Sequence, residues 1–350
     1  MDRYIGLDAH TSSCTVAVVG PSGKRLRSVV VETNAAALIE VIRMIPGTRH
    51  LCMEEGTLSE WLYEGLSPHV QELVVKGVGQ SQGSKSDKLD AFGLAERLRI
   101  GAIETRVFKE RGRFGRLKHL AKVHQVLVGV SVRAQLRIKT LLRSRGMQAS
   151  GRSAYTCRGR EAWLDRLPEA ARLHAELLYR EYDVLDELRK EARRELIKEA
   201  RKHPPYRLVK TCPGLGPIRT AELLPVVVTP HRFRSKRAFW SYCGVGIVMR
   251  SSSDWVQTRA GGWVRAEVRQ TRGLNRNFNH TLKRIFKSAA TTVIGRADDE
   301  PLYRHYLRLL DGGTKPNLAT LTIARQIGSI TLSVWRNQEV YDPKRLEHLT

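Results

Sequence analysis

Hydrophobic and polar positions in the first 110 residues form short runs that are typical of alternating strands and helices. Apolar, β-branched runs at residues 3–8, 14–19 and 24–31 predict a three-stranded meander with a turn at Pro21-Ser22-Gly23. The following pattern predicts helices over residues 34–45, 58–66 and 86–99, and strands over residues 50–54 and 72–75. Residues 1–112 are therefore predicted to form an α/β domain.

The pattern changes at about residue 113 to the helical period. Apolar residues recur at every third or fourth position over residues 113–147, and a second long pattern follows Pro168 and ends at Pro204-Pro205. Either stretch fits a bundle helix or a coiled coil, and the dense opposite charges of the second favour an exposed helix that pairs with a partner. We predict a helical, coiled-coil oligomerisation region over residues 113–205 and a mostly α-helical C-terminal domain over residues 206–350.

The net charge of the chain is more informative about its function than its length is. The chain has 350 residues, 60 Lys and Arg against 35 Asp and Glu, and a formal net charge of +25. Such a surplus indicates a polyanionic partner, because neutralising phosphates releases condensed counterions; solvated basic faces are the less favoured alternative. There is no run of 18 apolar residues and no signal-peptide pattern, and the five cysteines lack a CxxC spacing. We expect a cytoplasmic, nucleoid-associated protein with reduced thiols and no membrane partner.

Four carboxylates form the first candidate site. Asp8 and Glu54 each end an apolar strand, where a half-buried acid is costly unless it is paired or binds a cation. Asp87 and Asp90 are three residues apart, so a helix places both on one face. Together these four acids could hold Mg²⁺, which prefers oxygen ligands and orients phosphodiester cleavage.

Each acid also has a structural interpretation. Asp87 could stabilise the first turn of a helix, Asp90 could pair with a nearby Lys or Arg, and Asp8 could cap a turn. Glu55 competes with Glu54, since adjacent strand residues face opposite ways. The joint order favours a site: an acid on the first strand of a meander, one on the fourth strand and two on a later helix. That order is the layout of the ribonuclease H-like fold.

A glycine turn in the C-terminal half is the second candidate. In Pro213-Gly214-Leu215-Gly216, the two glycines let backbone amides approach a phosphate at a helix N-terminus, close to Lys210. This is typical of a helix-hairpin-helix binder of the DNA backbone. A tight turn between two helices is the structural alternative.

Three consecutive serines form the third candidate. Taken alone, Ser251, Ser252 and Ser253 fit a polar loop, and a serine nucleophile needs activation by a base, a metal or positioning cations. Five arginines supply positive charge suited to phosphate chemistry and nucleic-acid binding: Arg250, Arg259, Arg265, Arg269 and Arg272. We expect Trp255 and Trp263 in a core, although tryptophans can also stack on bases.

With these residues identified, nearly the whole chain resembles the DEDD transposases of bacterial insertion sequences. The resemblance is to the bridge-RNA-guided group, which combines a RuvC-like N-terminal domain with a serine-bearing transposase domain. It is carried by Gly6-Leu7-Asp8-Ala9-His10, Met53-Glu54-Glu55-Gly56, Lys85-Ser86-Asp87-Lys88-Leu89-Asp90-Ala91, Pro213-Gly214-Leu215-Gly216 and Tyr242-Cys243-Gly244-Val245. The family pattern selects Glu54 over Glu55.

The resemblance also selects a serine. The family's nucleophile follows the glycine that matches Gly244 by eight residues, which gives Ser252. Ser253 stands where family members usually have glycine, so Ser251 and Ser253 remain alternatives. The resemblance implies that Asp8, Glu54, Asp87 and Asp90 bind Mg²⁺ while Ser252 attacks the scissile phosphate covalently.

The same resemblance implies the partners. A structured RNA from the same element would specify donor and target DNA, and a basic surface of the C-terminal domain would bind DNA and RNA. The long helices would form a homo-oligomer, a dimer or tetramer, in which one subunit's acids face another's serine.

Other function classes fit less of the sequence. A junction-resolving nuclease of the RuvC-like kind needs the acids but no serine. Gly6-Leu7-Asp8-Ala9-His10-Thr11 faintly resembles the first phosphate loop of actin-like sugar kinases, but a second glycine-rich segment is missing and the basic charge stays unexplained. A non-catalytic RNA-binding protein is a third alternative.

Overall fold

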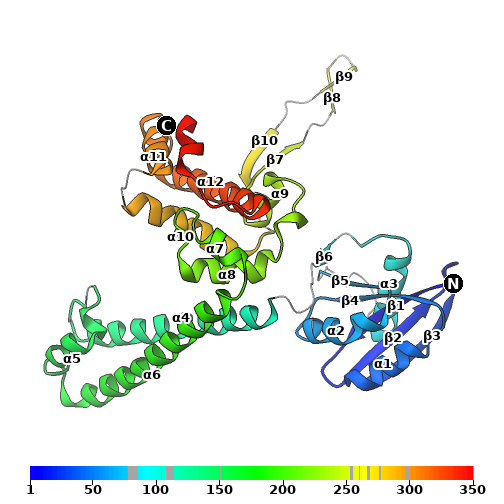
Figure 1. Ribbon diagram of the computed structural model, residues 1–350, viewed down its shortest axis with the longest axis horizontal. Helices are drawn as coiled ribbons and strands as arrows, with labels where there is room; N and C mark the ends of the chain where they lie inside the picture. Colours follow the sequence, from blue (N-terminus) through cyan, green and yellow to red (C-terminus); the bar gives the residue numbers. More distant parts are fainter. Residues whose placement is uncertain are drawn as a thin grey trace. The chain divides into compact units, whose positions relative to one another are not determined.

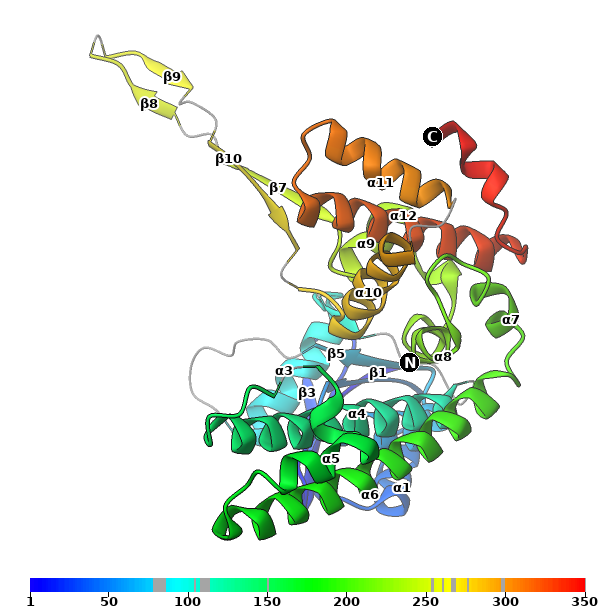
Figure 2. The same cartoon turned by 90° about the vertical axis from the view of Figure 1, so that its left-hand side faces the viewer.

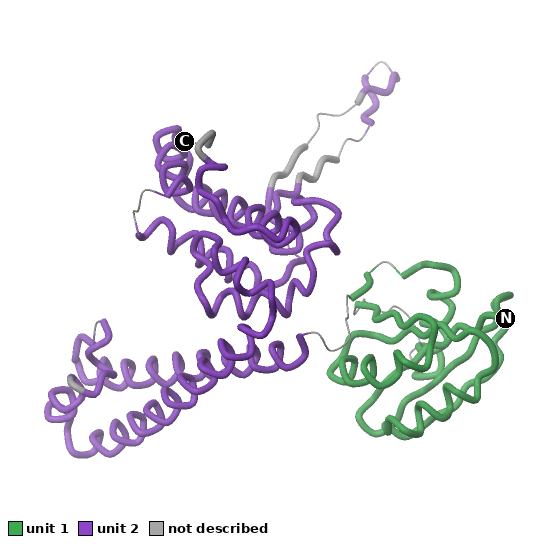
Figure 3. Tube along the Cα trace, viewed as in Figure 1, with its two compact units in different colours: residues 1–113 green, residues 114–350 purple. Residues whose placement is uncertain are grey.

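The chain folds as two compact units, residues 1–113 and residues 114–350, which Figure 3 shows in separate colours. The computed structural model describes residues 1–77, 86–103, 105–107, 114–149, 151–252, 255–259, 261–265, 269–275, 277–296 and 300–349. Among these residues, the helices are all too short or too polar to cross a membrane.

The first unit is a mixed six-stranded sheet with the strand order β3-β2-β1-β4-β5-β6 (Figure 1). The first three strands form the predicted antiparallel meander, β4 and β5 run parallel to β1, and β6 is antiparallel to β5. The elements are β1 Asp2–Ala9, β2 Ser13–Val19, β3 Arg25–Glu32, α1 Ala35–Arg43, β4 Thr48–Glu54, α2 Ser59–Leu66, β5 Glu72–Lys76, α3 Asp87–Arg99 and β6 Arg106–Val107.

Strand alternation assigns the two faces of this sheet to different helices. Ile5 and Leu7 of β1 join a core with buried residues of α1 and α2. On the other face, a Cβ added to Gly6 would lie 1.8 Å from the carbonyl oxygen of Ala91 in α3. Helix α3 therefore packs directly on the backbone of β1, and the face that carries Gly6 also carries Asp8.

Two long helices begin the second unit. Helices α4 (Gly115–Arg143) and α6 (Glu169–Ala200) lie side by side and are joined through the short α5 (Cys157–Leu164), as Figures 1 and 2 show. The distal part of the pair has its own core, which includes Ile138, Leu142, Ala175 and Tyr179. The helical pattern over residues 113–205 is thus present in the structure.

The helical C-terminal region packs around α12. Its helices are α7 Pro205–Val209, α8 Pro217–Val227, α9 Lys236–Tyr242, α10 His280–Arg296, α11 Pro301–Asp311 and α12 Pro316–Asn337. Phe239, Phe286 and Ile327 are buried in its core, and that core also contains Leu117 of α4 and Leu196 of α6. The long helices and the C-terminal helices consequently share one core within the second unit.

The C-terminal half also contains strands that the sequence did not predict. Strand β7 (Ile247–Ser252) pairs antiparallel with β10 (Arg269–Leu274), and β8 (Trp255–Gln257) pairs with β9 (Trp263–Arg265). In both views these strands extend away from α9 and α12 (Figures 1 and 2). The expected core positions of Trp255 and Trp263 are wrong, because both side chains are more than 60% exposed on this hairpin.

Candidate functional site

The end of β1 and the start of α3 bring three of the candidate acids to one side of the sheet. Asp8 follows Gly6 on the α3 face, and Ser86 caps α3 by accepting a hydrogen bond from the Leu89 amide. Asp87 and Asp90 lie in the first turn, where the helix dipole favours negative charge. Because α3 packs on Gly6, its N-terminus is held close to Asp8.

A histidine that sequence reasoning did not select lies among these acids. His10 Nε2 is 3.3 Å from Asp8 Oδ2 and 3.6 Å from Asp87 Oδ1. One ligand atom from each of Asp8, His10 and Asp87 falls within 4.8 Å of the other two. The side chains of His10 and Asp87 are 54% and 61% exposed, so the group is open to solvent. His10 occupies the space between two carboxylates, where a cation would be attracted.

The electrostatics of Asp8 are unfavourable for its charged form. Partial burial raises the pKa of Asp8 above its ordinary value of 3.8, and the neighbouring Asp87 and Asp90 raise this pKa further. The contact with His10 acts in the opposite direction but does not cancel the effect. An acid whose charge is opposed by its own fold is typical of functional sites.

Glu54 lies on the neighbouring strand with a different partner. Leu7 and Met53 are paired in the parallel register, so Asp8 and Glu54 come next on their strands and face the same side. Glu54 Oε1 accepts a hydrogen bond of 2.5 Å from Nζ of Lys76, a lysine that is 8% exposed at the end of β5. The close group of Asp8, His10 and Asp87 does not include Glu54.

This electrostatic arrangement predicts that Asp8→Asn stabilises the metal-free protein. The amide removes a charge opposed by burial and by two nearby aspartates, so we expect a gain of about 0.5–2 kcal/mol in the free energy of unfolding. Because folding raises the Asp8 pKa, the cost of its charge develops as the pH rises above 3.8, and the gain should be present at pH 7. Chemical denaturation in EDTA measures it, with the exposed Glu40→Gln as control. A less stable Asp8→Asn variant would make the acid a structural one.

The glycine turn forms the connection between α7 and α8. Gly214 has a φ of +67°, and a Cβ there would lie 2.4 Å from the Ala289 carbonyl oxygen of α10. Gly216 is the N-cap of α8 and provides no side-chain cap. The turn therefore packs tightly against α10 and also leaves the first amides of α8 without a side-chain acceptor.

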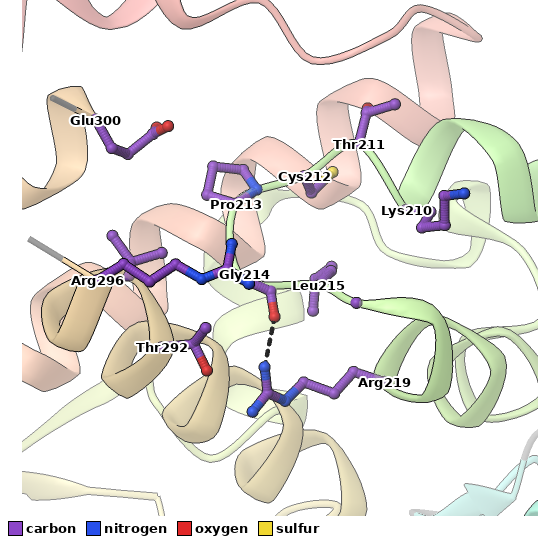
Figure 4. A pocket seen from close by; sticks show the side chains of 12 residues that line it. Lys210, Thr211, Cys212, Pro213, Gly214, Leu215, Arg219, Thr292, Arg296 and Glu300 are labelled. Carbon is purple, nitrogen blue, oxygen red and sulfur yellow. Dashed lines mark hydrogen bonds between the residues drawn. The ribbon is translucent and has the colours of Figure 1, made fainter. Parts of the chain in front are cut away.

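A cavity of about 310 Å³ lies against this turn (Figure 4). Lys210, Arg219 of α8 and Arg296 of α10 line it, and Arg219 Nη1 donates a hydrogen bond of 2.7 Å to the Gly214 carbonyl. The sequence had selected Lys210, Gly214 and Gly216 here. It missed Arg219 and Arg296, which come from helices whose packing brings them to the turn.

The serine segment is a strand. Ser251 and Ser252 lie in β7, opposite Gln270 and Arg269 of β10, so the polar-loop interpretation is wrong for these two residues. Ser253 lies outside the described residues, as does Lys85 of the acidic motif. Arg250 and Arg272 also belong to the β7–β10 ladder, Arg265 is in β9, and Arg259 is exposed beside β8. For Ser252 and for these arginines other than Arg259, only the backbone is described.

The part of the chain that contains the turn and the strands matches a known protein family, and the chain also resembles one insertion-element protein. Residues 206–307 match the family model described as the transposase IS116/IS110/IS902 family. Over 160 residues the chain is 24% identical to the insertion element IS116 uncharacterized 44.8 kDa protein of Streptomyces clavuligerus. That alignment covers 46% of this chain and only 36% of the relative's length.

The family model describes one class of protein, the transposases. The relative's name adds that it comes from an insertion element, so both matches are to proteins of insertion sequences. The family match includes α8, α9, β7–β10 and α10, and therefore the glycine turn and Ser252. The acidic group of the first unit lies outside the matched residues 206–307.

Proposed function

We propose that the protein cleaves and rejoins DNA strands of an insertion sequence. The observation that carries the proposal is the meeting of acids from β1 and α3 in a chain whose residues 206–307 match a transposase family. The test is strand exchange between labelled donor and target DNA in the presence of Mg²⁺ and any RNA that co-purifies. Sequencing that RNA tests whether the protein binds a structured guide RNA from the same element. Purified protein that leaves all DNA unchanged under these conditions would contradict the proposal.

The first unit supplies the metal-dependent part of this proposal as a ribonuclease H-like, RuvC-like domain. The antiparallel β1–β2–β3 meander followed by parallel β4 and β5 supports this assignment, together with the location of the acids on β1, β4 and α3. The rival interpretation as a sugar kinase gains no support from the family match of residues 206–307. A junction-resolving nuclease stays as the alternative, since it would use the same acids.

The donor set fits Mg²⁺. Asp8 and Asp87 offer carboxylate oxygens from two elements, Asp90 is on the same helical turn, and Glu54 is on the adjacent strand. Bound Mg²⁺ would supply charge neutralisation for the scissile phosphate and its leaving oxygen. The protein itself would hold Asp8, Asp87 and Asp90, together with Glu54 of the adjacent strand, on one side of the sheet. The contacts of His10 and Lys76 would balance those acids in the metal-free protein.

Ser252 is proposed as the nucleophile. Its Oγ would form a bond to phosphorus as the bond to one DNA oxygen breaks, releasing a DNA hydroxyl and passing the serine proton to a base or water. The phosphodiester energy is kept in the phosphoserine, so a DNA hydroxyl can reverse the step and rejoin strands. The backbone pairing of Ser252 with Arg269 in the β7–β10 ladder supports this choice, because arginine is a residue type suited to phosphate chemistry.

The net charge predicts a steep dependence of nucleic-acid binding on salt. The log–log slope should be about −0.9 for each duplex phosphate neutralised, and six contacts would lose roughly 10³-fold in affinity between 50 and 200 mM salt. Fluorescence anisotropy with duplex DNA and with structured RNA measures this slope, with an uncharged polymer as the blank. An affinity that does not change with salt for either nucleic acid would contradict the inference that the positive charge binds phosphates.

We propose that the protein forms a homo-oligomer in which α6 makes the contact between subunits. Four apolar residues of this helix are 44–62% exposed, and at 100° per residue they fall within about 60° around the helix axis: Leu173, Leu177, Val184 and Leu188. This narrow stripe has the width of a coiled-coil seam. The stripe lies on the solvent-facing side of α6, away from the side that packs on α4.

The stripe predicts which substitutions separate the subunits. Leu177→Glu together with Val184→Glu should convert a dimer or tetramer to monomers at micromolar concentration, because the charges would be buried in the seam. Light scattering after size exclusion measures the mass. The control is His174→Glu, which adds one glutamate at an exposed position beside the stripe. Unchanged mass in the double variant, or a monomeric wild type, would contradict the assignment.

A further inference from the structure

Two cavities flank the N-terminus of α8. The first, of about 310 Å³, lies against the glycine turn. The second, of about 720 Å³, is bounded by α4, α6, α8 and α10. Gly216 and Arg219 line both cavities, so the start of α8 forms the wall between them.

Cationic side chains outnumber carboxylates around these cavities. Lys210 and Arg296 line the first, Arg193 and Arg284 line the second, and Arg219 lines both. Their linings include two acids, Glu300 in the first and Glu222 in the second. The five cations thus face two carboxylates.

Both of these carboxylates have partners within the protein. Glu300 accepts a hydrogen bond of 2.5 Å from the hydroxyl of Tyr341. Glu222 is 2% exposed, lies 3.2 Å from His124 Nδ1 and accepts a hydrogen bond of 2.7 Å from Arg284 Nη2. Hydrogen bonds from His124 and Arg284 hold the pKa of Glu222 below its ordinary value despite its burial. These acids are consequently used in the fold.

Arg219 shows the effect of this surplus of positive charge around the two cavities. Its guanidinium is half-buried and, within the described part of the chain, donates a hydrogen bond to the neutral Gly214 carbonyl. Burial lowers the pKa of Arg219, and the proximity of Arg284 and Arg296 lowers it further. An anion in either cavity would relieve this repulsion, and the uncapped amides of the first turn of α8 would add donors.

We propose that the two cavities bind two successive phosphates of one nucleic-acid strand, with Arg219 contacting both. Lys210 and Arg296 would complete the first phosphate site, and Arg193 and Arg284 the second. Val128 and Ile218 give the second cavity an apolar wall, which suits the sugar and base that accompany a phosphate. The inference rests on the proposed function for its ligand class, and it adds the number of phosphates and the residues that hold them.

Removing one exposed arginine from each cavity tests the two sites separately. Arg296→Gln and Arg193→Gln should each weaken binding about tenfold. Each should also reduce the salt slope by about 0.9 for duplex DNA, or about 0.7 for a single strand or RNA. The double variant should lose about twice that slope. Arg219→Gln should approach the double variant, and thermal melting shows whether it stays folded.

The control is Arg308→Gln, which removes one charge from an exposed position of α11 outside both cavities. Duplex DNA, single-stranded DNA and RNA are compared as ligands, so that the strand carrying the two phosphates is identified. If Arg296→Gln and Arg193→Gln change the slope no more than Arg308→Gln does, the two phosphate sites are wrong while the proposed function stands. A wild-type protein that binds none of the three ligands would contradict the proposed function itself.

Discussion

Asp87→Ala and Asp90→Ala are each expected to reduce DNA cleavage at least a hundredfold while DNA binding stays near that of the wild type. Asp87 belongs to the solvent-exposed group that it forms with Asp8 and His10, and Asp90 is close enough to Asp8 to raise the pKa of that acid. Removing either carboxylate weakens a site that is proposed to stabilise the leaving oxygen by several kcal/mol, and each 1.36 kcal/mol is a factor of ten in rate. A nicking assay in Mg²⁺ measures cleavage, and a gel-shift assay measures binding.

The control for this experiment separates chemistry from charge and folding. Glu40→Ala removes an exposed carboxylate from α1, on the opposite face of the same sheet, and should cleave normally. Loss of the favourable charge at the start of α3 should cost only about 0.3–1 kcal/mol of stability, so circular dichroism should find both aspartate variants folded. Wild-type cleavage by a folded variant would remove that aspartate from the site.

The first unit could be predicted well because its signals are local. Each of β1 to β5 is a short apolar run, and α3 has a serine cap followed by two acids in its first turn. The i, i+3 spacing of Asp87 and Asp90 therefore placed them together before any contact was known. His10 carried a usable signal, since it follows Asp8 by two residues and comes directly after the end of β1.

Other features depend on contacts between distant parts of the chain. The β7–β10 ladder pairs polar residues such as Ser251 with Gln270, so no apolar alternation marks these strands. Glu222 reads as an odd acid in an apolar helix, and its partner His124 is 98 residues away. Lys76 likewise ends an apolar strand without a visible reason until Glu54 lies beside it. Sequence periodicity gives no information on such pairings.

Ser252→Ala is expected to abolish a covalent link between the protein and cleaved DNA. Attack by a side-chain hydroxyl leaves one DNA end bonded to the polypeptide, whereas attack by water or a DNA hydroxyl leaves free or joined DNA ends. Labelled DNA is incubated with protein, Mg²⁺ and any co-purified RNA, then denatured, and the label that migrates with the polypeptide is measured. The wild type should form the adduct, and Ser252→Ala should form at least a hundredfold less.

The neighbouring serines are the matched controls for this substitution. Ser251 immediately precedes Ser252 in β7 and Ser253 follows it in the sequence, so the three variants differ only in the position of the lost hydroxyl, and Ser252 is the proposed nucleophile. Ser251→Ala and Ser253→Ala should therefore keep the adduct. If the adduct is lost with one of them instead, the nucleophile is that serine. If protein that cleaves DNA never carries the label, the acids act without a serine, and a junction-resolving nuclease becomes the better description of this chain.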